Sequence, residues 1–238
     1  MSELFPTRTI AIEYLSCTDE SRTYEFNKWY RTIHIPDLLQ TPGMLNVTRY
    51  RNMAETLKEG LPRYTTIYRL DSNQPWSVMQ KVIQDNKERA EQGRMIDCLK
   101  SYQIGVWDFS AMRTSIRPQQ GPATRLPDGM PEALLVIPTT CTDPAREKEF
   151  NDWYLNIHFH DLLETPGLVQ AHLWRSLNPK PDEREARYMA LYEIDAEDPP
   201  AIVRHILSVD QTKRGPQGRM IDCIKLRYAS GTYEHIDL

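Results

Sequence analysis

Two histidines, His34 and His158, have neighbours that suit acid–base chemistry. Each follows an aromatic, helix-like segment and has an asparagine and a tyrosine on neighbouring turns. These neighbours are Asn27 and Tyr30 for the first histidine, and Asn151 and Tyr154 for the second. An imidazole with an ordinary pKa near 6.5 can accept or donate a proton near neutral pH. We expect either a catalytic base or a structural histidine that ties the helix end to the following Thr-Pro-Gly turn.

The two histidines belong to a long internal repeat. Segment 25–43 returns 124 residues later as segment 149–167, and with one inserted residue 93–98 returns as 218–223. A period of this length is typical of a duplicated domain rather than of a solenoid repeat. We predict a first domain at 1–112, a linker punctuated by proline and glycine at 113–130, and a second domain at 131–238.

The second copy carries polar residues that the first copy lacks. His160, His172 and Trp174 stand where the first copy has Pro36, Thr48 and Tyr50. His172 lies on an expected strand, where alternation places it on the same side as Trp174. If that side faces a cavity, His158 and His172 converge on one ligand, and the second copy is the better candidate for an active site. Otherwise His172 is a seam or solvent-facing residue, and His160 is a solvated helix position.

Other residues could assist such chemistry. Glu13 occurs only in the first copy, because Ile137 takes its place in the second. It is either a general base or orienting partner, or an outward residue of an alternating strand. Tyr64 and Tyr188 lie on matching strands, where they could donate a hydrogen bond to an enolate or phenolate oxygen, or simply pack.

Two further features occur once in each copy. The Arg-Met-Ile-Asp segments at 94–97 and 219–222 suggest a structural ion pair, with binding of a substrate carboxylate as the alternative. The four cysteines, Cys17, Cys98, Cys141 and Cys223, show no Cys-x-x-Cys spacing, which argues against a zinc site or a redox motif. We expect buried or half-buried free thiols and no metal site.

The elements that must position these residues follow the order β-α-β-β-α-β. In the first copy, segment 8–14 alternates like a strand, and apolar residues from 26 to 33 recur at helical spacing. Further strands are expected at 45–51, 63–70 and 95–109, with a second helix from about 75 to 93. This order is the ferredoxin-like split βαβ unit, and the second copy repeats it from 133 to 233. Because each sheet has one bare face, we predict an α+β protein whose two ferredoxin-like sheets pack face to face.

The composition excludes some classes of partner. With a net charge of −4 and a pI near 5.9, the chain lacks the basic excess that phosphate neutralisation needs. No apolar run approaches the roughly 20 residues that span a bilayer, and the first residues have no charged-then-apolar signal pattern. We therefore expect a cytoplasmic protein that binds neither nucleic acid nor membranes.

The pattern Phe-Asn-x-Trp-Tyr-x-x-x-His-x-x-Asp-Leu-Leu-x-Thr-Pro-Gly after a first strand resembles the dimeric α/β barrel superfamily, most closely its EthD-like proteins. The resemblance covers both copies. It implies a ligand cavity between sheet and helices, and usual members are homodimers of a single copy. The superfamily includes cofactor-free monooxygenases, polyketide cyclases, muconolactone isomerases and haem-binding peroxidases, so the resemblance specifies the fold more closely than the chemistry.

From these residues and this resemblance we predict a cofactor-independent enzyme that acts on an aromatic or polyketide-like small molecule by histidine-mediated proton abstraction. It would be a carbon–carbon lyase, a cyclase or an isomerase. His158 would be the base, His172 a second acid–base group, and Tyr154 with Tyr188 would hold the developing oxyanion, with His34 as the counterpart in the first copy. The residues expected to contact the substrate are Glu13, Asn27, Tyr30, Tyr64, Asn151, His160 and Trp174.

Two alternatives stay open. One is a cofactor-free monooxygenase of a phenolic substrate. The other is a non-catalytic protein that binds an aromatic molecule or haem. In each case the fused pair could form a further homodimer.

Overall fold

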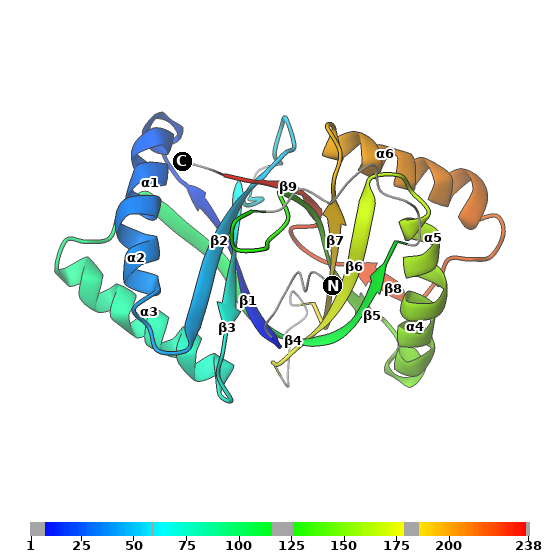
Figure 1. Ribbon diagram of the computed structural model, residues 1–238, viewed down its shortest axis with the longest axis horizontal. Coiled ribbons are helices and arrows are strands. Elements are labelled where there is room, and N and C mark those ends of the chain that lie inside the picture. The colour runs from blue at the N-terminus through cyan, green and yellow to red at the C-terminus, as the bar shows by residue number, and fades with distance from the viewer. Residues whose placement is uncertain (1–7, 59, 116–125, 179–185, 237–238) are drawn as a thin grey trace.

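The computed structural model describes residues 8–58, 60–115, 126–178 and 186–236, which form two halves of similar architecture (Figure 1). The strands of the first half are β1 (Thr9–Cys17), β2 (Met44–Asn52), β3 (Tyr64–Leu70) and β4 (Leu99–Thr114). Its helices are α1 (Thr23–Trp29), α2 (Ile35–Leu38) and α3 (Pro75–Glu91), with a 3-10 turn, η1 (Glu20–Arg22), before α1. This order agrees with the predicted β-α-β-β-α-β unit.

The second half repeats this order with one interruption. Its strands are β5 (Ala133–Cys141), β6 (Leu168–Ser176), β7 (Tyr188–Ile194), β8 (Ile224–Leu226) and β9 (Gly231–His235). Its helices are α4 (Glu147–Trp153), α5 (Phe159–Leu163) and α6 (Pro199–Val209), with η3 (Pro144–Arg146) before α4 and η5 (Asp210–Arg214) after α6. The expected last strand breaks between β8 and β9, where Ala229 has a φ of 65°. Both pieces pair with β5, so together they take the place of β4.

The helix that carries each candidate histidine is not α-helical throughout. A π-helical turn, η2 (Tyr30–His34), lies between α1 and α2, and its counterpart η4 (Tyr154–His158) lies between α4 and α5. Turns of this kind are rare and occur often at functional sites. Both turns end at the repeated histidine, which the sequence pattern placed on an ordinary helix.

Local sequence sets the two ends of the first helical segment. At its start, Asp19 accepts a hydrogen bond from the backbone N–H of Ser21 at 3.0 Å, as the polar turn predicted. At its end, Gly43 has a φ of 88°, and a Cβ there would lie only 3.0 Å from Cγ2 of Val78. Glycine suits this turn because it adopts positive φ without a steric penalty and lets α3 approach.

All the described strands except the short β8 form one closed barrel. The strand orders are β4-β1-β3-β2 in the first half and β9-β5-β7-β6 in the second. The halves join at two seams, where β4 pairs with β6 and β2 pairs with β9. The repeat relates these seams, because β6 corresponds to β2 and β9 to β4. The two sheets therefore face each other across a common core, as predicted, and their edges are also hydrogen-bonded.

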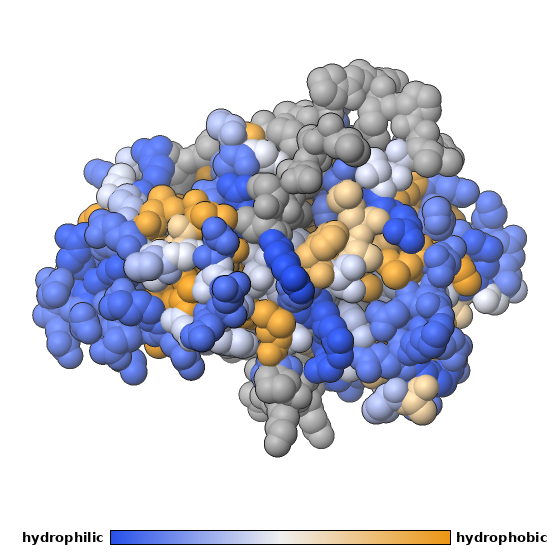
Figure 2. Space-filling view, turned by 60° about the horizontal axis from the view of Figure 1, so that its bottom comes forward, coloured by the Kyte–Doolittle hydropathy of each residue, from blue (hydrophilic) through white to orange (hydrophobic). Residues whose placement is uncertain are grey.

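Apolar side chains fill the barrel and the spaces under the helices. Ile12, Trp107, Trp174, Leu191 and Tyr233 belong to the core inside the barrel. Separate apolar clusters lie between each sheet and its own helices. The helices cover the outside of the barrel on opposite sides (Figure 1). In the space-filling view the outer flanks are mostly hydrophilic, and apolar residues gather nearer the middle (Figure 2).

Part of the expected linker, residues 116–125, lies outside the described residues. Of the remainder, Thr114 is the last residue of β4 and Met130 is fully buried in the barrel core. The proposed domain boundaries stay predictions. Among the described helices, none combines the length and the apolar character needed to cross a bilayer.

Candidate functional site

A cluster of buried polar side chains lies between the sheet and the helices of the first half. Glu13 projects from β1, Arg49 from β2 and Tyr68 from β3, and alternation along the strands points all three toward the helices. Glu13 is 8% exposed and Arg49 is 3% exposed. Together with Tyr30 from η2 and Thr66 from β3, these residues form what we call the polar cluster.

Hydrogen bonds and a cation–π contact connect the polar cluster from end to end. The Tyr68 hydroxyl donates to Oε2 of Glu13. The Tyr30 hydroxyl lies 3.4 Å from the Tyr68 hydroxyl and 3.1 Å from Oγ1 of Thr66. The guanidinium of Arg49 lies over the Tyr30 ring, 3.8 Å from its centroid. A carboxyl group, two phenols and a cation thus lie in continuous contact.

Burial changes the acid–base properties of this cluster. Desolvation raises the pKa of Glu13, against the opposing effects of hydrogen bonds from Ser101 and Tyr68 and of the Arg49 charge. Desolvation and the nearby Glu13 raise the pKa of Tyr30 to about 12, and they raise the pKa of Tyr68 well above its ordinary value. Among the carboxyl and phenol groups of the cluster, Glu13 is therefore the one whose pKa moves toward neutral pH.

Arg49 is a buried cation without a described counter-ion. Its Nη1 and Nη2 each donate to Oδ1 of Asn27 at 3.3 Å, and its Nε has no hydrogen-bond partner. None of the described carboxylates forms an ion pair with it, although the nearby Glu13 charge opposes the desolvation that lowers its pKa. A guanidinium nevertheless stays protonated in proteins. Its Nε is buried as well as unpaired, so an anionic oxygen reaches this donor only if the neighbouring side chains move.

Arg49 also lines a cavity of about 290 Å³ beside β2. Ile35, Val47 and Ile236 contribute apolar walls, Arg31 adds a second cation, and Asp128 adds a carboxylate. Small-molecule pockets usually span about 300–1,000 Å³, so this cavity suits a ligand at the small end of that range. Arg49 therefore contacts both the open cavity and the Tyr30 ring, and the hydrogen-bonded series that ends at Glu13 begins at the Tyr30 hydroxyl.

The corresponding space in the second half is apolar. Ile137, Leu173 and Ala190 stand where the first half has Glu13, Arg49 and Thr66. The three replacements pack in one large apolar cluster that also contains Tyr154 and Tyr192. The sequence favoured the second copy as the richer site, whereas at these three positions the structure places a buried carboxyl and a buried guanidinium in the first half.

The two repeated histidines do not have the pKa expected of a base near neutral pH. Desolvation, reinforced by an arginine nearby in each half, lowers the pKa of His34 to about 3 and that of His158 to about 3. The His34 ring stacks on Trp29 with 4.7 Å between centroids, and the half-buried His158 ring stacks on Trp153 at 4.4 Å. In contrast to an imidazole with the ordinary pKa near 6.5, an imidazole with so low a pKa is a weak proton acceptor at pH 7.

His172 does not meet His158, so the predicted convergence of the two imidazoles is wrong. His172 lies on the barrel-facing side of β6 with Trp174, whereas His158 lies under the helices, and the sheet separates them. Nε2 of His172 is 2.7 Å from Oε1 of Glu193, and both side chains are 1% exposed. His160 is exposed, which agrees with the alternative of a solvated helix position.

An asparagine and a tyrosine pair in each half. Nδ2 of Asn27 donates to the Tyr64 hydroxyl at 3.5 Å, and Nδ2 of Asn151 donates to the Tyr188 hydroxyl at 2.9 Å. The Tyr188 hydroxyl in turn donates to Oε1 of Glu147 at 2.6 Å. That bond uses the proton that an oxyanion would need, so this geometry does not favour Tyr188 as the oxyanion donor.

The repeated Arg-Met-Ile-Asp segments do not form an internal ion pair. Arg94 instead binds Asp37 at 2.7 Å, and Asp97 binds Arg22 at 2.6 Å. The second half repeats both contacts with Arg219–Asp161 and Arg146–Asp222. Each segment therefore contacts two elements, which anchors the turn before the last strand to the first helical segment.

Comparison with known proteins places this architecture. No family model and no curated protein matches the sequence. An anthrone oxidase-like protein superposes with a TM-score of 0.63 at 13% identity, over 98% of this chain and 93% of that one. This is the dimeric α/β barrel fold. A chlorite dismutase of Candidatus Nitrospira defluvii shares it with a TM-score of 0.59, 12% identity and coverages of 98% and 93%. A proposed monooxygenase of Fusobacterium nucleatum follows at a TM-score of 0.50, 12% identity and coverages of 98% and 99%. At these identities the likeness establishes the fold alone.

The comparisons correct the expectation that no cofactor is involved. Chlorite dismutases, which bind haem, are among the proteins that share the fold, so the dimeric α/β barrel is compatible with a prosthetic group. Among the described residues, the two candidate histidines under the helical layers do not suit the role of a haem ligand. A tryptophan face covers each candidate histidine, and aromatic side chains fill the space beneath the second-half helices. Within the described ranges, no three or more His, Cys, Asp or Glu residues gather around a potential metal position.

The sequence reasoning missed Arg49 and Tyr68 as functional candidates. Comparing the two copies could have identified Arg49, because the second copy has Leu173 at the matching position. This is the same kind of difference between the copies as Glu13 in the first and Ile137 in the second. Tyr68 had no such signal, because a tyrosine occupies the matching position in the second copy.

Proposed function

We propose that this chain is an enzyme that binds a small aromatic or polyketide-like molecule through an anionic oxygen and removes a proton from it, forming an enolate or a phenolate. The observation that carries the proposal is Arg49, a buried cation without a described counter-ion at the wall of a cavity. Behind it, the hydrogen-bonded series through Tyr30 and Tyr68 reaches Glu13.

Arg49 would hold the substrate. Keeping a buried charge without a partner costs several kcal/mol, and an anionic ligand offsets that cost when it supplies the missing acceptor. A carboxylate, phenolate or enolate oxygen can accept from Nε and from an Nη at once. Ile35, Val47 and Ile236 would contact the apolar ring.

Glu13 would be the final proton acceptor. Its raised pKa brings the carboxyl closer to the working pH, which is what general acid–base catalysis needs. A proton that reaches the Tyr30 hydroxyl can pass through the Tyr68 hydroxyl to Glu13, because each hydroxyl accepts one proton as it gives up another. Catalysis of this kind is typically worth about 100- to 10,000-fold.

The reaction class after proton removal stays open between two candidates. A lyase, cyclase or isomerase rearranges the resulting carbanion, whereas an oxygenase lets it react with dioxygen. The likeness in fold to an anthrone oxidase-like protein favours including anthrones in any substrate panel. Oxygen consumption separates the two classes. The proposal differs from the histidine-based mechanism expected from the sequence, because His158 has a pKa of about 3.

Deuterium exchange tests the proposal whatever the final product is. Phenols, anthrones and β-diketones are incubated with the protein in D₂O, and exchange at the acidic carbon or an adjacent ring position is followed by NMR. The wild type should accelerate exchange for at least one compound, and Glu13→Gln should lower the rate by about 100-fold or more while the substrate still binds. Tyr192→Phe, on the matching strand of the second half, is the control and should exchange like the wild type. Equal rates in wild type and Glu13→Gln would remove Glu13 from the mechanism.

Association of two fused chains stays a further proposal. The strand edges that join the two halves, β2, β4, β6 and β9, are paired within one chain. A dimer of the fused pair would therefore use surfaces other than these seams. Sedimentation velocity over a range of concentrations would measure it.

A further inference from the structure

We propose that Cys17 and Cys98 form a redox-active thiol pair that a hydroperoxide oxidises to a disulfide. This inference does not depend on the proposed function, because it uses a different part of the first half. It also separates the two repeated cysteine pairs, of which only the first would react.

The backbone brings the two thiols together. Cys17 ends β1, Cys98 immediately precedes β4, and the backbone N–H of Thr18 donates to the Cys98 carbonyl at 2.8 Å. The two sulfurs lie 3.3 Å apart, and the Cys17 thiol is oriented to donate to Cys98 or to the Asp19 carbonyl. Since a disulfide bond is about 2.0 Å long, closing it needs an approach of only about 1.3 Å.

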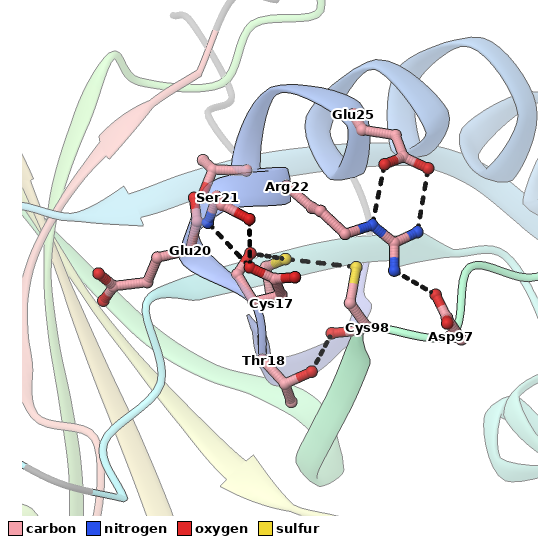
Figure 3. A network of polar contacts seen from close by, with 10 residues as sticks. Cys17, Thr18, Glu20, Ser21, Arg22, Glu25, Asp97 and Cys98 are labelled. Carbon is pink, nitrogen blue, oxygen red and sulfur yellow. Dashed lines mark hydrogen bonds and ion pairs between the residues drawn. The ribbon is translucent and has the colours of Figure 1, made fainter.

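A clamp of charged residues holds the Cys98 side of the pair in place (Figure 3). Arg22 donates through Nη1 to Asp97 at 2.6 Å, and through Nε and Nη2 to Glu25 at 2.9 and 3.0 Å. The Arg22 charge and hydrogen bonds lower the pKa of Asp97 and of Glu25, so both stay ionised. The clamp therefore ties the residue before Cys98 to the start of α1 while the thiols react.

The two pairs differ in access. Cys17 is only half-buried and lines an open groove of about 1,080 Å³, whose wall includes the basic residue Lys100. In the second half, the sulfurs of Cys141 and Cys223 lie 3.6 Å apart, and both residues are buried, at 9% and 3% exposure. A peroxide therefore has a route to the first pair, and burial protects the second.

The chemistry assigns different roles to the two thiols. The Cys17 thiolate attacks one peroxide oxygen, so that an S–O bond forms, the O–O bond breaks, and the alcohol or water leaves after taking a proton. The thiol of Cys98 then attacks the Cys17 sulfur, the S–S bond forms, and the hydroxyl leaves as water with the Cys98 proton. Two thiols lose two electrons in total and the peroxide gains them. Burial raises the pKa of Cys98 to about 11, which suits the second, resolving role better than the first attack.

Peptide mapping after exposure to hydrogen peroxide tests the proposal on the full chain. The titratable thiols should fall from four to two, and the non-reduced digest should contain a Cys17–Cys98 linked peptide that dithiothreitol releases. Cys141 and Cys223 should stay alkylatable. Cys98→Ser should leave a sulfenic acid on Cys17 that dimedone traps, whereas Cys223→Ser should form the Cys17–Cys98 link at the wild-type rate.

Three outcomes would overturn the proposal. Equal oxidation of both pairs would mean that access does not select the first. Absence of the linked peptide from oxidised wild type, with Cys17 accumulating as sulfinic acid, would mean that Cys98 does not resolve it. Four unchanged thiols would mean that the groove does not admit peroxide. Mapping of the wild type gives these answers even if a cysteine variant fails to fold.

Discussion

Replacing Arg49 by leucine gives the first half the residue that the second half carries at position 173. The substitution removes a cation–π contact with Tyr30 worth about 0.5–2 kcal/mol and two long hydrogen bonds to Asn27 worth about 1 kcal/mol together. It also removes a buried charge without a described counter-ion, and replacing buried charges by apolar residues is often neutral or stabilising by about 1–4 kcal/mol. The free energy of unfolding should therefore stay within about 1 kcal/mol of the wild type or rise.

Binding should respond in the opposite direction. Removing a buried partner of an anionic group costs about 2–4 kcal/mol of binding free energy, which is about 30- to 1,000-fold in Kd. Urea unfolding measures the first quantity, and isothermal titration with 1-hydroxy-2-naphthoate as an anionic aromatic probe measures the second. Arg51→Leu is the matched control, because Arg51 is exposed and paired with Glu234. Its loss should change unfolding by less than about 1 kcal/mol and leave probe binding unchanged.

One combination of results would refute the reasoning. If Arg49→Leu lost more than about 3 kcal/mol of stability and bound the probe as the wild type does, Arg49 would be a structural residue. A loss of affinity in Arg51→Leu equal to that in Arg49→Leu would show that general charge, rather than the buried guanidinium, attracts the probe.

Three further predictions follow from the buried groups. Burial raises the pKa of Glu13 in the folded state above its ordinary 4.5. The stability that protonated Glu13 contributes is therefore present below pH 4.5 and is lost as the pH rises through the folded pKa. In urea unfolding at a series of pH values, Glu13→Gln should show a smaller decline of the midpoint with pH than the wild type. His34 and His158, with folded pKa values of about 3, should show no NMR titration near pH 6.5. The free energy of unfolding should fall as the pH drops from 6.5 toward 3, because the unfolded chain binds these protons first. A titration near pH 6.5 would contradict the desolvation of the two rings. Tyr68→Phe should lower the free energy of unfolding by about 1–3 kcal/mol, because it leaves the buried Glu13 carboxyl without its phenol donor. Tyr192→Phe, which lies beside apolar residues, should lower it less. Equal losses in urea unfolding would argue against the hydrogen-bonded series.

The internal repeat allowed the element order to be predicted. Segments that match residue by residue at a constant offset must share loop lengths, so the strands and helices predicted from periodicity in one half apply to the other. These predictions were wrong where the backbone geometry departs from a regular strand or helix. The π-turn at Tyr30–His34 and the break around Ala229 have no periodic signature, because both depend on how neighbouring strands and helices pack.

The site was less predictable than the fold. Strand alternation showed that His172 and Trp174 share a face, but not whether that face meets the helices or the barrel interior. The choice decides whether His172 meets His158, and only the packing of one sheet against the other settles it. The asymmetry of Glu13 was visible in the sequence, yet its importance emerged when Tyr68 and Arg49 were found on the same side.

Periodicity and repeat register are local properties of the residues, so they were enough to predict two similar β-α-β-β-α-β units in one chain. Which side chains lose their water, and which charges lie near them, depends on how the sheets and helices pack. The pKa of His34 depends on the layers of sheet and helix that surround the imidazole and on the Arg89 charge. The arrangement of three strands and a helix likewise leaves Arg49 without an ion-pair partner among the described residues. Desolvation and Coulomb interactions act through space rather than along the chain, so these properties exist only once the barrel has closed.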